Sequence, residues 1–69
     1  MSRAKLNAHL ESALPQTTPA MRRAILAIQI DQMTWREAAI RHKVTESGIL
    51  KAMRRGKVRE FLAGIGQPS

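Results

Sequence analysis

The sequence contains no cysteine and only two aromatic residues, Trp35 and Phe61. Without cysteine the chain forms no disulfide and offers no thiolate to a zinc ion. No apolar run approaches the roughly 18 residues that a membrane-spanning helix needs, and the first residues lack the apolar stretch of a secretory signal. The shortage of aromatic residues also disfavours RNA modules that stack bases on several rings, and interfacial membrane helices.

Catalytic constellations are also missing. The five acidic residues form no pair suited to acid–base catalysis, and His9 and His42 stand far apart without the spacing of metal ligands. No glycine-rich loop that could hold a phosphate is present. We therefore expect no enzyme activity, no cofactor, no metal and no small-molecule ligand, and we expect both histidines at the surface.

Positive charge is abundant and unevenly distributed. The net charge is +7 and the sequence pI is about 11.6. From Arg36 to Arg59 there are eight basic residues against two acidic ones, Glu37 and Glu46. A solvated basic surface would keep a small protein soluble, but this clustering favours a polyanionic partner over a membrane surface.

A chain of 69 residues forms one domain with a small core. Its apolar spacing is helical throughout, so the expected fold is all-α, a small bundle of four to five short helices. Leu6, Leu10 and Leu14 share one face of a helix predicted over residues 2–14. Pro15 should end that helix, because the residue before a proline avoids helical angles.

A core of three helices is predicted over residues 18–55. Thr18 and Pro19 provide the cap and the first residue of one helix. The helix should end before Asp31, where the chain is expected to turn. Thr34 and Glu37 form a capping box, with one hydrogen bond expected in each direction, and predict a helix from Trp35 to about His42.

The third helix of that core should follow a turn at Lys43 and Val44, with Thr45 as its cap and Gly56 at its end. Ile49, Ala52 and Met53 lie at i, i+3, i+4 and predict its inner face. A last helix is expected over residues 57–64, packed back on the core, followed by a tail over residues 65–69.

Two small residues stand in the predicted second helix of this core, and a valine turn and a polar helix start follow them; the residues are Ala38, Ala39, Val44, Thr45, Glu46, Ser47, Ile49 and Ala52. Through these residues, the segment 18–55 resembles a homeodomain-like, trihelical helix-turn-helix, as in small bacterial and phage transcriptional regulators and in the DNA-binding domains of site-specific recombinases. The family commonly has glycine just before the turn valine, whereas Lys43 stands here. A left-handed conformation at Lys43 would carry modest strain.

The resemblance implies that the second helix of the motif lies in the DNA major groove. Its residues that would face the DNA are Thr45, Glu46, Ser47, Lys51 and Arg54. Gly48 either permits close approach to the DNA or is a tolerated weak position. The residues expected to meet phosphates are Arg36, Lys43, Arg55, Lys57 and Arg59.

Several of these positions have a second interpretation. Thr45 acts as a cap whether or not it touches DNA, and Glu46 either accepts from cytosine N4 or only complements the helix dipole. Trp35 fits core packing better than an indole–phosphate contact. Arg3 and Lys5 could form an arm into the minor groove, but we favour the solvent face of the first helix for both.

The resulting functional hypothesis is sequence-specific binding of double-stranded DNA by a small transcriptional regulator, a repressor that occupies its operator. A single recognition helix reads few base pairs, so a homodimer is expected, with the N-terminal leucines as its seam. The expected location is the cytoplasm of a bacterial or phage-infected cell, at the nucleoid. The alternatives are a non-specific architectural DNA binder, an adaptor for an acidic protein partner, and a detached module of a recombinase or transposase.

Overall fold

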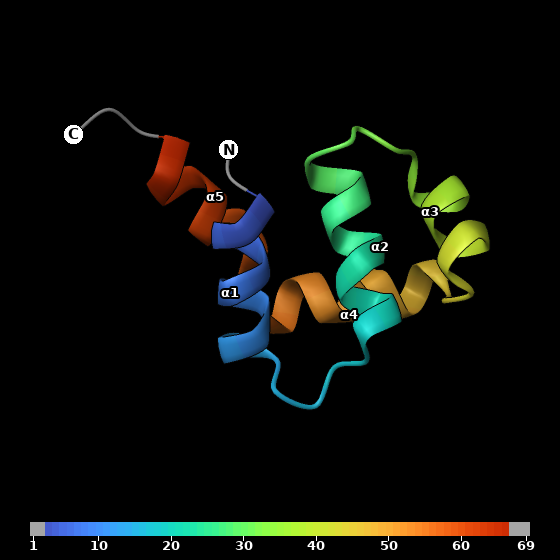
Figure 1. The fold of residues 1–69 in the computed structure, drawn as a ribbon, viewed down its shortest axis with the longest axis horizontal. Helices are drawn as coiled ribbons and strands as arrows, with labels where there is room; N and C mark the ends of the chain where they lie inside the picture. The colour runs from blue at the N-terminus through green and yellow to red at the C-terminus, as the bar shows by residue number, and fades with distance from the viewer. Residues whose placement is uncertain (1–2, 67–69) are drawn as a thin grey trace.

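The computed structural model describes residues 3–66, and the side chains of residues 3–64. Within this part the chain forms five α-helices and no strand, as the sequence predicts (Figure 1). The helices are α1 (Arg3–Ala13), α2 (Pro19–Gln29), α3 (Trp35–His42), α4 (Glu46–Arg55) and α5 (Val58–Gly66). None of the helices described is long and apolar enough to cross a membrane.

Three threonines set the starts of α2, α3 and α4. The Thr18, Thr34 and Thr45 hydroxyls accept hydrogen bonds from the backbone N–H groups three residues later, at 3.2, 3.1 and 2.9 Å. Each bond satisfies an N–H group that the first helical turn leaves without a partner. The three caps are thus as predicted, and of the capping box at α3 the structure has the bond from the Glu37 N–H.

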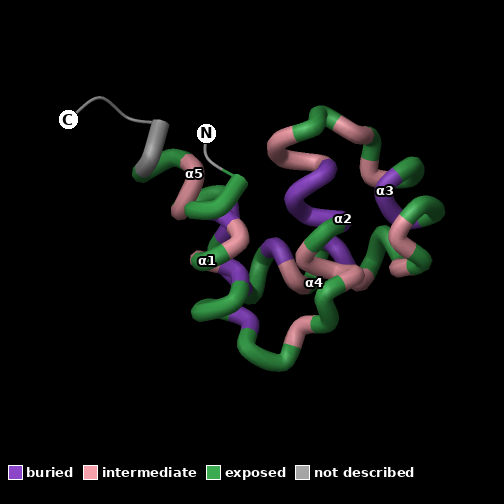
Figure 2. Tube along the Cα trace, viewed as in Figure 1, coloured by how far each residue is buried: buried purple, intermediate pink, exposed green. Residues whose placement is uncertain are grey.

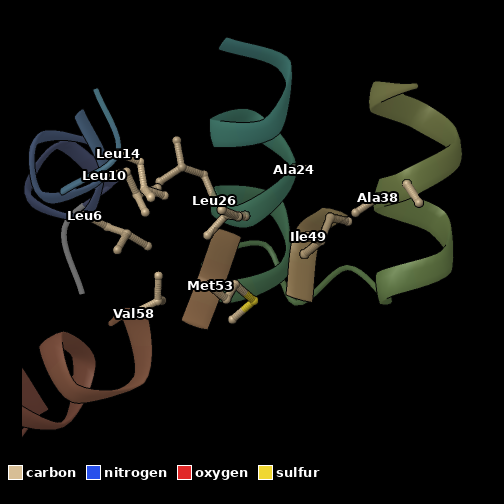
Figure 3. Packing of buried hydrophobic residues seen from close by; sticks show 11 residues of the cluster. Leu6, Leu10, Leu14, Ala24, Leu26, Ala38, Ile49, Met53 and Val58 are labelled. Atoms are coloured by element: carbon tan, nitrogen blue, oxygen red, sulfur yellow. The ribbon is translucent and has the colours of Figure 1, made fainter. Parts of the chain in front are cut away.

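The core lies around α2, which contacts α1, α3 and α4 (Figure 1). Ile25 of α2 and Ile49 of α4 are completely buried, and so is Ala38, whose small side chain allows α3 to approach closely. Figure 3 shows Ile49 between α2 and α3. Buried segments run along α2 and the inner sides of α1 and α4, while the outer side of α4 remains exposed (Figure 2).

Two expectations for the N-terminal helix are now decided. Leu6, Leu10 and Leu14 are buried against the rest of the core (Figure 3). They are therefore not a surface seam, and the expectation that they join two copies is wrong. Arg3 is part of α1 and donates to both Asp31 carboxylate oxygens at 2.7 and 2.6 Å, so it does not form a free arm.

The C-terminal end of the chain differs in detail from the prediction. Gly56 follows α4 as expected, but with φ −82° and ψ −1°, and the left-handed residue is the next one, Lys57, with φ 52°. Gly56 is a glycine because it is buried: a Cβ there would lie 3.1 Å from Leu14 Cδ1. Helix α5 continues to Gly66, two residues beyond the predicted end, so the predicted tail is wrong for residues 65–66 and lies outside the described residues for 67–69.

His9 is not the simple surface residue that the sequence suggests. It is half-buried, its Nε2 donates to the Gly56 carbonyl oxygen at 2.7 Å, and its ring stacks on Phe61 with the centroids 4.0 Å apart. The carbonyl oxygen can only accept, so the bond requires a proton on Nε2. His9 therefore connects α1 to the junction between α4 and α5.

Candidate nucleic-acid interface

Helix α4 presents one face to the core and the opposite face to solvent. Ile49 and Met53 are buried and hold the helix in one rotational position. Because successive residues turn by 100°, Ser47, Lys51 and Arg54 lie on the other side, and all three are exposed. The structure thus brings these three predicted DNA-facing side chains onto one surface.

The cap of α4 is part of the same surface. Thr45 and Glu46 are exposed at the start of the helix, so both predicted positions are accessible. The Thr45 hydroxyl is already engaged with the Gly48 N–H at 2.9 Å, and its remaining lone pair and proton are free for a further partner. The carboxylate of Glu46 stands in the first turn, where the helix dipole favours negative charge.

Gly48 faces Thr45 and Met21. A Cβ built on it would lie 2.8 Å from Thr45 Oγ1 and 3.0 Å from the Met21 methyl carbon. The glycine therefore makes room for the cap of its own helix and for the packing of α2. This is a structural reason for glycine at this position, separate from close approach to a ligand.

All the cations predicted to meet phosphates are exposed. Lys43, Arg55 and Lys57 lie on α4 or at its ends and Arg59 lines a depression beside it, whereas Arg36 lines a separate depression on α3. Arg36 comes from the first turn of α3 and Arg59 from the first turn of α5. Lys43 and Lys57 stand at the two ends of α4, and both adopt left-handed conformations, with φ 57° and φ 52°. Lys43 thus adopts the left-handed conformation for which the sequence analysis expects modest strain.

Within the described part of the chain, the cations on and directly after α4 have no acidic side chain paired with them. Of the side chains described in residues 3–64, those of Lys51, Arg54, Arg55 and Lys57 take part in no ion pair. An ion pair that does form, between Arg3 and Asp31, joins α1 to the α2–α3 turn. The turn follows the C-terminal end of α2, whereas it is the N-terminal end of α2, near Thr18, that lies next to α4. This ion pair is therefore at the other end of α2 from the cations of α4.

Two shallow depressions flank the outer face of α4. One lies toward the start of α2, where Thr18 and Met21 face Lys51 and Arg55. The other lies toward α3 and α5, and its lining residues are Trp35, Leu50, Met53, Arg54, Lys57, Arg59 and Glu60. Cations border both depressions, so positive charge extends to either side of a protruding helix.

The sequence reasoning missed Leu50. This side chain is 39% exposed and lies beside Arg54 on the outer part of α4. Its position was available from the helical register, because it follows Ser47 by three residues and precedes Arg54 by four. Trp35, at the edge of the same depression, is half-buried and packs against the core, as the sequence interpretation favoured.

The shape of this surface suits a DNA groove. An α-helix with side chains is about 10–12 Å across, and the major groove of B-DNA is about 12 Å wide. Helix α4 has 10 residues, which corresponds to a length of about 15 Å.

In the part of the chain that the structure describes, no group of three acidic, histidine or cysteine side chains could hold a metal.

No protein-family model, curated protein or solved structure matches this chain. Inferences about its function therefore rest on its own residues and their arrangement.

Proposed function

We propose that this chain binds double-stranded DNA sequence-specifically and acts as a small transcriptional repressor. The observation that carries the proposal is the outer face of α4. Ser47, Lys51 and Arg54 are exposed along one side of a helix of groove size, with unpaired cations at both of its ends. Such a protein would act at the nucleoid, in the cytoplasm of a bacterial or phage-infected cell.

The division of labour follows from the chemistry of each side chain. Lys51 and Arg54 can donate to O6 and N7 of guanine, and Ser47 can donate or accept at several base edges. Five further cations would neutralise phosphates, which fixes the position of α4 without reading sequence. They are Lys43, Arg55, Lys57 and Arg59 on or beside α4, and Arg36 on α3. Repression would follow from occupancy of an operator.

A homodimer remains part of the proposal. One helix of this length reads only a few base pairs, and helix-turn-helix proteins generally combine two such helices on half-sites one DNA turn apart. The buried leucines of α1 are not available as the seam. A palindromic binding site would be the signature of the dimer.

The test is a selection of bound duplexes from a random pool at about 150 mM salt, near physiological ionic strength. It is performed with the wild type, with Lys51→Ala and with Arg3→Ala. Both substitutions remove one exposed cation from a helix, and alanine preserves helix propensity. Lys51 lies on the proposed reading face, whereas Arg3 lies on α1.

We expect a defined motif for the wild type, a blurred motif for Lys51→Ala and an unchanged motif for Arg3→Ala. Retention of DNA without enrichment would contradict sequence reading and indicate an architectural DNA binder. Absence of DNA retention, together with a stoichiometric complex with an acidic protein, would overturn DNA binding in favour of an adaptor.

A further inference from the structure

Leu50 is an apolar side chain placed within a cationic surface. Among the described residues, Ile40 and Leu50 are the large hydrophobic side chains that remain exposed, at 71% and 39%. Ile40 lies on the outer side of α3. Leu50 instead lies on α4, directly before Lys51, where the structure places the proposed base-reading side chains.

The surroundings of Leu50 restrict what can cover it. Arg54, Lys57 and Arg59 border the same depression, together with Glu60 and the half-buried Trp35, so its rim carries three cations and one carboxylate. A cationic rim of this kind attracts an anionic partner by charge complementarity, while the exposed leucine would be buried only by an apolar group. The partner that fits should therefore present an apolar group on a polyanion.

Duplex DNA has one such group in its major groove, the C5 methyl of thymine, which side chains recognise by apolar contact. We propose that Leu50 is a specificity-determining residue that packs against a thymine methyl. This inference rests on the proposed function, because it requires α4 to lie in the major groove. It assigns to the binding site a T·A pair that the charged residues of α4 would not distinguish.

The register of α4 places the thymine relative to the other contacts. Leu50 is three residues from Ser47 and four from Arg54, which corresponds to about 4.5 and 6 Å along the helix axis. Base pairs are about 3.4 Å apart, so the thymine should lie within one or two steps of the bases that Ser47 and Arg54 read. The motif found by selection should accordingly contain a required T·A pair beside its charged-residue contacts.

The experiment replaces each thymine of the selected motif, one at a time, by deoxyuridine, which lacks only the methyl group. With the wild-type protein, we expect one or two adjacent replacements to weaken binding about fourfold, the effect of leaving one methyl group in water. With Leu50→Ala, the same replacements should leave the affinity unchanged. This scan of the wild type needs no variant, so it tests the proposal independently of folding.

Ile40→Ala is the matched control, because it also truncates an exposed large hydrophobic residue on a neighbouring helix. It should retain the full sensitivity to deoxyuridine, and thermal unfolding should show that both variants are folded. If a motif is selected but deoxyuridine has no effect, or an equal effect on Leu50→Ala, the role of Leu50 is overturned while sequence-specific binding stands. If no motif is selected, the proposed function fails first, and this inference fails with it.

Discussion

Gly48 illustrates how one atom can cancel the gain expected from an ordinary substitution. Glycine to alanine within a helix usually stabilises a protein by about 1 kcal/mol. Here the new Cβ would lie 2.8 Å from Thr45 Oγ1, the atom that caps the helix, and a lost cap costs about 1 kcal/mol. We expect Gly48→Ala to change the free energy of unfolding by less than about 0.5 kcal/mol, because the two effects offset each other.

A second background separates the two effects. Thr45→Ala removes the hydroxyl and with it the steric conflict, and the remaining neighbour, the Met21 methyl carbon at 3.0 Å, ends a flexible side chain. Adding Gly48→Ala to Thr45→Ala should then stabilise the protein by about 1 kcal/mol in urea unfolding. An equal gain in both backgrounds would contradict this account of the glycine.

Single residues differ in how well their roles follow from the sequence. Lys43 was predictable as a left-handed residue, because the turn of the resembling family commonly has glycine there. The contacts of His9 were not predictable, since its partners Gly56 and Phe61 are 47 and 52 residues away in the chain, and no local pattern encodes such contacts. The exposure of Leu50 was also missed, although the helical register places it outside the inner face formed by Ile49 and Met53.

At the scale of elements, the turn between α3 and α4 combines backbone strain with a cation. Lys43 has φ 57° and ψ 44°, a conformation that costs an L residue roughly 1 kcal/mol. Lys43→Gly should relieve that strain and raise the free energy of unfolding by about 0.5–1 kcal/mol. It should also weaken DNA binding, because the proposed phosphate contact is lost.

Lys51→Gly is the matched control for the turn, since it makes the same chemical change in the middle of α4. Glycine there should lower the free energy of unfolding by about 1 kcal/mol. Chemical denaturation and DNA titration of the two variants should thus give opposite signs for stability and the same sign for affinity. A Lys43→Gly variant that binds DNA like the wild type would remove Lys43 from the phosphate-contacting set.

The bounds of elements followed the sequence where capping chemistry is local. Thr18, Thr34 and Thr45 each lie next to the helix that they start, and α3 begins and ends at the predicted residues. The end of α5 was predicted two residues too early, at Gly64, whereas the helix continues to Gly66. Glycine disfavours a helix by only about 1 kcal/mol, which is not enough to end one.

For the molecule as a whole, the fold class and the basic surface were predictable, whereas the packing of α1 was not. Periodicity gives the faces of helices but not their partners, so Leu6 and Leu10 fitted a dimer seam as well as a core. The structure buries them against the rest of the chain. All five helices contribute to one continuous core. The outer side of α4 is left exposed, and unpaired cations lie on it.

The distribution of charge over the molecule predicts which cations govern the dependence of DNA binding on salt. Each phosphate that a protein neutralises adds about −0.9 to the slope of log affinity against log salt. Arg55, exposed at the end of α4, should contribute to that slope, so Arg55→Ala should reduce its magnitude by about 1 while leaving the selected motif unchanged. Arg3→Ala also removes one positive charge, but Arg3 is paired with Asp31 and lies on α1. This variant should therefore have the same slope as the wild type. Titrations of both variants at several salt concentrations measure this directly, and equal loss of slope in the two would mean that net charge, rather than the surface around α4, determines binding.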